Sequence, residues 1–123
     1  MAESELRRRV RQADTAEAID ASLPPAASTP FVLALAEHAC HLSLADELGD
    51  GELSVGVRAE ISHIAPSPVG AELVATPVLV EASHPRFEFS VEVREGDQLV
   101  AKVRHSRAIV PRRKIDQLLV REM

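Results

Sequence analysis

The sequence predicts an α+β fold in which an antiparallel β-sheet wraps around one long central α-helix. Residues 29–48 form a stretch that is apolar on nearly all sides, which is typical of a buried helix. Residues 51–110 show alternating apolar and polar positions interrupted by short turns, which is typical of consecutive strands. Because helices and strands do not alternate along the chain, the pattern favours antiparallel strands that cover the helix over a doubly wound parallel sheet.

The composition predicts a single domain and excludes several functional classes. The 123 residues are 46% hydrophobic and 27% charged, which is ordinary for one globular domain. Three Phe, no Trp or Tyr and a net charge of -5 disfavour a nucleic-acid partner. Cys40 is the only cysteine, so no intrachain disulfide is possible, and no stretch is long enough to span a membrane. We therefore expect a cytoplasmic protein with no membrane partner.

Residues 1–27 are expected to form an irregular arm with a first short strand. Only residues 15–19 suggest a strand, before two prolines interrupt the pattern. The helix is expected to begin at Thr29, because Thr fits an N-cap and Pro30 fits the first helical position. Gly49 supplies the end of the helix near residue 48.

Four strands are expected after the helix. Residues 71–82 form the second of them, and Pro77 indicates a bulge or an edge position there. Residues 86–94 and 99–110 form the third and fourth, joined by a short turn. His63 lies on the apolar face of the first strand, which has five other apolar members: Leu53, Val55, Val57, Ala59 and Ile61. A sheet of this kind around a central helix is the hotdog arrangement.

Glu37 and His63 are predicted to lie where the helix meets the sheet. A carboxylate in so apolar a stretch must be paired, neutralised or exposed in a cleft. Glu37 and His63 could then share one site. The structural alternatives are an ion pair between Glu37 and His41 one turn on, and a core histidine bonded to a backbone carbonyl.

The last strand places His105 and Arg107 on its apolar face. A buried arginine there can contact an anionic group of a substrate or form a salt bridge at the strand end. Residues 37–41 (EHACH) lack the spacing of zinc sites, so no metal is predicted. The sequence also has no glycine-rich nucleotide loop and no serine-hydrolase elbow.

Six short segments in a fixed order add a family resemblance. They are Asp14-Thr15-Ala16, Ser28 to Val32, Leu35 to Ala39, Val55-Gly56, Ser62 to Gly70 and His105-Ser106-Arg107. With these segments the chain resembles the fluoroacetyl-CoA thioesterase-like family of hotdog-fold proteins over nearly its whole length.

The resemblance implies an acyl-CoA thioesterase with Thr29, Glu37 and His63 at the family's catalytic positions. It also implies a backbone amide at Gly56 near the thioester and a substrate-binding arginine at Arg107; His105 is a further candidate for substrate binding. The coenzyme A is part of the substrate, so no separate cofactor is expected. The resemblance does not extend to the acyl group.

Thr29 and Glu37 are separated by about 12 Å if an unbroken helix joins them. Either the chain at Thr29 folds back before the helix, or the two groups meet around a substrate between two subunits. We therefore expect a homodimer or a higher homo-oligomer. Two other functions remain open, a hotdog acyl-CoA hydratase or dehydratase and a non-catalytic module that binds an acyl-CoA or a small acid.

Overall fold

The structure is a computed structural model that describes residues 5–121, so the first four residues of the predicted arm lie outside the described residues. In chain order the elements are β1 (Leu6–Arg9), η1 (Gln12–Asp14), α1 (Ala16–Ile19), α2 (Thr29–Ser43), η2 (Ala45–Glu47), β2 (Glu52–His63), β3 (Glu72–Ser83), β4 (Arg86–Glu95), β5 (Gln98–Pro111) and α3 (Arg112–Leu119).

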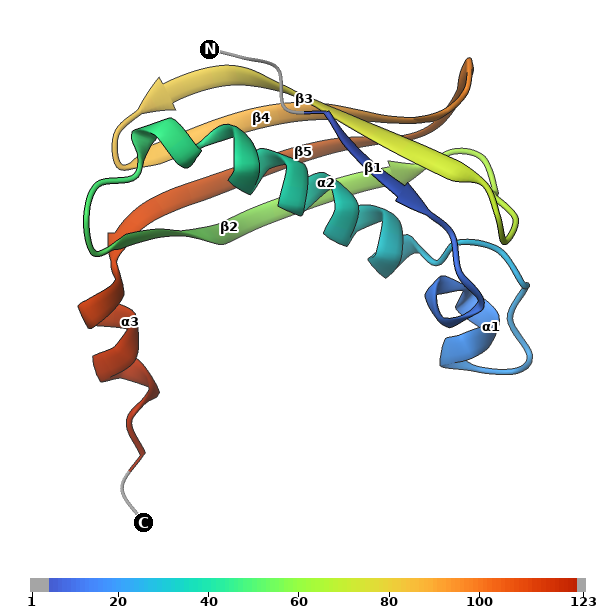
Figure 1. Ribbon diagram of the computed structural model, residues 1–123, viewed down its shortest axis with the longest axis horizontal. Coiled ribbons are helices and arrows are strands. Elements are labelled where there is room, and N and C mark those ends of the chain that lie inside the picture. The colour runs from blue at the N-terminus through green and yellow to red at the C-terminus, as the bar shows by residue number, and fades with distance from the viewer. Residues whose placement is uncertain (1–4, 122–123) are drawn as a thin grey trace.

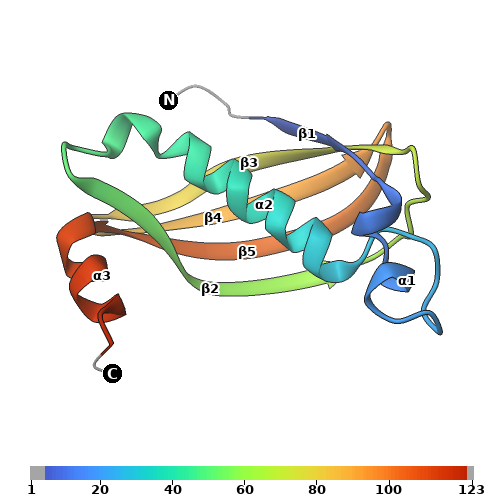
Figure 2. The same cartoon turned by 60° about the horizontal axis from the view of Figure 1, so that its bottom comes forward.

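The five strands form one antiparallel sheet in the order β1-β3-β4-β5-β2. The sheet curls around α2, which lies along its concave side (Figures 1 and 2). β1 and β2 are the two edge strands, and α3 extends away from the sheet at the end of β5 (Figure 1). The predicted α+β hotdog arrangement is confirmed.

The core lies between α2 and the concave face of the sheet. The sheet contributes large side chains such as Phe89, and the helix contributes a smaller set of buried residues: Val32, Leu35, Ala36, Ala39 and Cys40. The opposite side of α2 carries an exposed stripe of residues four apart, Ala34, His38 and Leu42. The prediction that α2 is buried on nearly all sides is therefore wrong for this stripe.

The start of α2 differs from the sequence prediction by one residue. Ser28 is the N-cap, and its Oγ accepts a hydrogen bond of 3.1 Å from the backbone N–H of Phe31. Thr29 and Pro30 are then the first two helical residues. Because Ser28 caps the helix, the hydroxyl group of Thr29 is available for another partner. The helix ends at Ser43, earlier than predicted, and continues as the short η2.

The arm contains its strand in a different place from the one predicted. β1 pairs with β3 from Leu6 to Arg9. Residues 15–19, which suggested a strand, instead begin the short helix α1, because the Oγ1 of the buried Thr15 accepts the N–H of Ala18 as an N-cap. The strand suggested for residues 15–19 is therefore wrong.

β2 contains a bulge that changes which side chains face the helix. Its pairing with β5 shifts by one residue between Gly56 and Arg58, which makes Val57 an extra residue. The bulge reverses the alternation of the strand. Ser54, before the bulge, is consequently buried on the helix side, whereas the side chain of Val57 is 42% exposed.

The predicted facing of β2 is therefore correct only after the bulge. Ile61 and His63 lie opposite buried residues of β5 and face the helix, as expected. Before the bulge, Ser54 takes the inward position. Leu53 and Val55, which were predicted to point inward, lie on the outer face of the sheet.

Pro77 lies inside β3 without interrupting the sheet. β1 pairs with β3 only as far as Ala75, so Pro77 lies in a part of β3 that forms an edge of the sheet, as predicted. The bulge of β3 occurs slightly later, between Leu79 and Glu81. No helix in the described part of the chain is long and apolar enough to cross a membrane.

Candidate functional site

Thr29 and His63 are joined by a hydrogen bond. The Oγ1 of Thr29, in the first turn of α2, lies 2.8 Å from the Nδ1 of His63, the last residue of β2. The other ring nitrogen of His63, Nε2, is buried and has no hydrogen-bond partner among residues 5–121. A buried polar atom without a partner is unusual in a folded protein and often marks a functional group.

Glu37 lies beside two basic side chains of β5. Its Oε1 is 3.7 Å from the Nε2 of His105 and 3.9 Å from the Nη1 of Arg107, and its side chain is 37% exposed. Neither distance is short enough for a hydrogen bond. The carboxylate accepts no hydrogen bond from any described residue. The structure therefore places Glu37 next to the cationic Arg107, and no described residue donates a hydrogen bond to its carboxylate oxygens.

Arg107 is buried, and protein groups hold each of its nitrogen atoms. Nε donates to the Oγ of Ser54 at 2.8 Å, and Nη2 donates to the backbone oxygen of Ser54 at 3.1 Å. Nη1 lies 3.0 Å from the Nε2 of His105. The nearest carboxylate is that of Glu37.

The hydrogen bonds of His105 determine its protonation state. Its Nδ1 lies 2.8 Å from the backbone oxygen of Arg58 and must donate to it. Its Nε2 must then accept from Arg107, because a guanidinium can only donate. His105 is therefore neutral in this arrangement. Burial lowers the pKa of His105, which agrees with a neutral ring.

Ser54 extends the same network to the helix. Its hydroxyl group accepts from Arg107 and lies 2.7 Å from the Nδ1 of His41. Burial, with the nearby charge of Arg107, lowers the pKa of His41. The alternative in which Glu37 pairs with His41 is not what the structure shows, since His41 bonds to Ser54. Burial also raises the pKa of the neighbouring Cys40 thiol to about 12, so this cysteine is not a thiolate nucleophile.

Gly56 allows the backbone of β2 to approach Glu37 closely. A Cβ atom at this position would lie 3.0 Å from the Oε1 of Glu37 and 3.3 Å from the Cε1 of His105. Any larger residue would therefore push against the carboxylate. This close approach accounts for a glycine within an otherwise regular strand.

The six predicted site residues form two groups within the chain. Thr29 and His63 make one pair at the start of α2, and the second group contains Glu37, Gly56, His105 and Arg107. Glu37 and His63 are not in hydrogen-bond or ion-pair contact in the described chain. The sequence left open an arrangement in which the chain at Thr29 folds back before the helix. This arrangement does not occur, because α2 is continuous from Thr29 to Ser43.

A pocket of about 330 Å³ adjoins Thr29 and His63. Its other lining residues are small or apolar: Ala16, Pro24, Ala26, Ala27, Ser28, Ile64, Ala65 and Pro66. This volume lies at the lower end of the range for small-molecule sites. The arm and the segment after β2 thus line an open, mostly apolar pocket.

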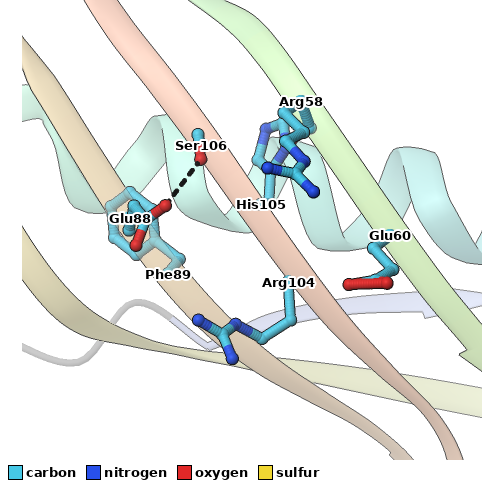
Figure 3. A pocket seen from close by; sticks show the side chains of 7 residues that line it. All are labelled: Arg58, Glu60, Glu88, Phe89, Arg104, His105 and Ser106. Carbon is cyan, nitrogen blue, oxygen red and sulfur yellow. Dashed lines mark hydrogen bonds between the residues drawn. The ribbon is translucent and has the colours of Figure 1, made fainter.

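A second hollow, of about 180 Å³, lies over β2, β4 and β5 (Figure 3). Its lining is mainly charged and of both signs, with Arg58, Glu60, Glu88 and Arg104. Of the predicted site residues it includes only His105. Its polar lining makes it unsuited to an acyl chain. No cluster of three or more potential metal ligands occurs among the residues that the structure describes.

We expect the thermal stability of the protein to decrease as the pH falls below about 6.5, the ordinary pKa of histidine. The pKa values of His41 and His105 are lowered in the folded protein. Below pH 6.5 the unfolded chain therefore binds more protons than the folded one, which favours unfolding until the folded-state pKa values are reached. The melting temperature should be measured between pH 8 and pH 5. A constant value over this range would contradict the lowered pKa values of His41 and His105.

Sequence reasoning missed Ser54 and His41. The alternation of β2 assigned Ser54 to the polar outer face, and only the bulge brings it inward. His41 was considered as a partner of Glu37 and not of Ser54. The one available signal was Gly56, because a glycine inside a strand often accompanies a bulge.

Comparisons with known proteins agree with the fold and with the family resemblance of the sequence. The family described as fluoroacetyl-CoA-specific thioesterase matches residues 10–113. The fluoroacetyl-CoA thioesterase of Streptantibioticus cattleyicolor is 29% identical over 90 residues, which cover 73% of this chain and 65% of that protein. The match thus spans less than two thirds of the length of that relative.

Solved structures show the same fold. A fluoroacetyl-CoA thioesterase aligns with a TM-score of 0.90 and 23% identity, covering 96% of this chain and 92% of the other. A mutant of such an enzyme in complex with fluoroacetate and CoA aligns with a TM-score of 0.85 and 23% identity, covering 94% of each chain. A hot-dog-like protein from Thermanaerovibrio acidaminovorans aligns with a TM-score of 0.87 and 22% identity, covering 96% and 87%. The match over most of the chain, together with this fold, shows that the protein belongs to the fluoroacetyl-CoA-specific thioesterase family, a family of hotdog-fold thioesterases.

Proposed function

We propose that this protein hydrolyses a small acyl-CoA thioester to the free acid and coenzyme A. The observation that supports this most directly is the Glu37 carboxylate, which is partly exposed, lies beside Gly56 and accepts no hydrogen bond within residues 5–121. Such a carboxylate can react with a thioester or with water. The family membership and the solved CoA complex of a related enzyme agree with a CoA thioester as substrate.

Two versions of the reaction are compatible with this geometry. In one, Glu37 removes a proton from water, the water oxygen bonds to the thioester carbon, and the C–S bond breaks. In the other, a Glu37 oxygen attacks the carbon and expels the thiolate, and water then hydrolyses the resulting anhydride. In both, a proton goes to the thiolate of CoA, and we assign this proton transfer to His63, with Thr29 positioning the ring. The backbone N–H of Gly56 would stabilise the developing oxyanion.

The acyl group is proposed to be small and aliphatic. The pocket beside Thr29 and His63 has a volume of only about 330 Å³ and is lined mostly by Ala and Pro side chains. It lacks the aromatic residues that would stack on an aromatic acyl group.

The complete site is proposed to form between two copies of the chain. Thr29 and Glu37 lie eight residues apart on one continuous helix, about 12 Å along its axis. β2 is a 12-residue edge strand, and edge strands readily pair with another chain. In a homodimer, the Glu37 group of one subunit would work with the Thr29–His63 pair of the other.

The test of this function is the release of free thiol from a panel of short, branched and aromatic acyl-CoAs. We expect rapid release from the short and branched members and slow release from the aromatic ones. No release from any member would contradict the proposal. In that case, stabilisation by an acyl-CoA without turnover would favour a binding module.

A further inference from the structure

The guanidinium of Arg107 does not pair with the carboxylate beside it. A buried arginine next to a carboxylate commonly forms two parallel hydrogen bonds of about 2.8 Å with it. Here the closest approach of Arg107 to Glu37 is 3.9 Å, from Nη1 to Oε1. The two charges are therefore close enough to attract each other, yet they are not bonded.

The partners of Arg107 explain this separation. Ser54 accepts from Nε with its hydroxyl group and from Nη2 with its backbone oxygen. His105 accepts from Nη1 with its Nε2. All three nitrogen atoms thus bond to groups other than Glu37. His105 can act as an acceptor only because the Arg58 carbonyl holds the proton of the ring on Nδ1.

The separation has a chemical consequence for Glu37. A carboxylate that accepts two hydrogen bonds from an arginine has one lone pair of each oxygen engaged, and it is a weaker nucleophile and a weaker base. A carboxylate near a cation that does not hydrogen-bond to it keeps its lone pairs free, while its negative charge is still compensated. On the proposed function, on which this inference rests, Glu37 needs those lone pairs.

We propose that Ser54 and His105 are positioning residues that hold Arg107 away from a hydrogen-bonded ion pair with Glu37 and so keep the carboxylate reactive. Arg107 then serves as a fixed cation of the site. This differs from a role in binding the phosphates of CoA, because the guanidinium is buried and each of its three nitrogen atoms already donates a hydrogen bond within the protein.

The test uses two variants of the full-length protein, Ser54→Ala and His105→Leu, each of which removes an acceptor from Arg107. We expect crystal structures of the variants to show Arg107 hydrogen-bonded to Glu37 at about 2.8 Å. We expect kcat to fall about ten- to a hundredfold while KM changes little. Ser54→Thr, which keeps the hydroxyl group, should restore kcat.

The matched control is Ser90→Ala on β4, whose hydroxyl group makes no hydrogen bond within the described chain, and it should leave kcat and the Arg107–Glu37 distance unchanged. An Arg107–Glu37 distance that stays near 3.9 Å in both variants would overturn the inference, whatever happens to the rate. The structural measurement does not depend on turnover. If the wild-type protein releases no thiol but the variants form the ion pair, the proposed function fails and the positioning inference stands.

Discussion

Thiol release is expected to fall about 10²- to 10⁴-fold when Glu37 is replaced by glutamine. Glutamine has nearly the same shape as glutamate, but its amide can neither accept a proton from water nor form an anhydride. The carboxylate accepts no hydrogen bond from the residues described, so the substitution breaks none, but it removes the nearest negative charge from the buried Arg107. The measurement is the rate of thiol release from the best acyl-CoA of the panel, with the melting temperature recorded in parallel.

A suitable control for this variant is Glu81→Gln, which removes a negative charge from an exposed position on β3. It should retain full activity. If Glu37→Gln kept full activity, both versions of the mechanism would be excluded. If it lost activity together with its melting transition, the comparison with Glu81→Gln would show whether the loss of a charge alone is responsible.

Co-expression of the two inactive variants Glu37→Gln and His63→Ala is expected to restore about a quarter of the wild-type activity if the site lies between two subunits. Random assembly makes half of the dimers mixed. In each mixed dimer, one of the two sites combines the intact Glu37 of one subunit with the intact His63 of the other. The other site carries both substitutions. Each variant alone should be nearly inactive.

The outcome separates the two possible arrangements of the site. If Glu37 and His63 of one chain worked together, every site of a mixed dimer would contain one lesion, and co-expression would restore nothing. An inactive mixture of variants that sedimentation shows to be dimeric would therefore reject the shared site. A monomeric wild-type protein would reject it as well. Recovery of activity would support both the dimer and the division of the site.

The parts of the fold that the sequence predicted are those in which packing reinforces the local pattern. β4 alternates cleanly, as does the middle of β5 from Ala101 to His105, and their inward residues, such as Phe89 and Val103, are buried in the core. The predicted strand at residues 15–19 is wrong because the side chain of Thr15 accepts a hydrogen bond from the N–H of Ala18, which stabilises a helical turn there. The conformation of such short segments depends on side-chain contacts that the hydrophobic periodicity of the sequence does not reveal.

The candidate site was predictable in its members but not in its geometry. Glu37, His105 and Arg107 were identified because charged residues on apolar faces are costly, and the structure brings all three together. The bond between Thr29 and His63 depends on Ser28 acting as the N-cap in place of Thr29. Ser54 was placed on the wrong face, since its inward position depends on the bulge at Val57.

The bulge at Val57 also bears on which changes of length β2 tolerates during evolution. Deleting this one residue would give regular pairing with β5, and Ser54, Gly56 and His63 would all still face the helix. A descendant without Val57 would thus keep the orientation of its site residues with one residue fewer between Glu37 and His63. In this family, a difference of one residue in that spacing is therefore not by itself a sign of lost activity.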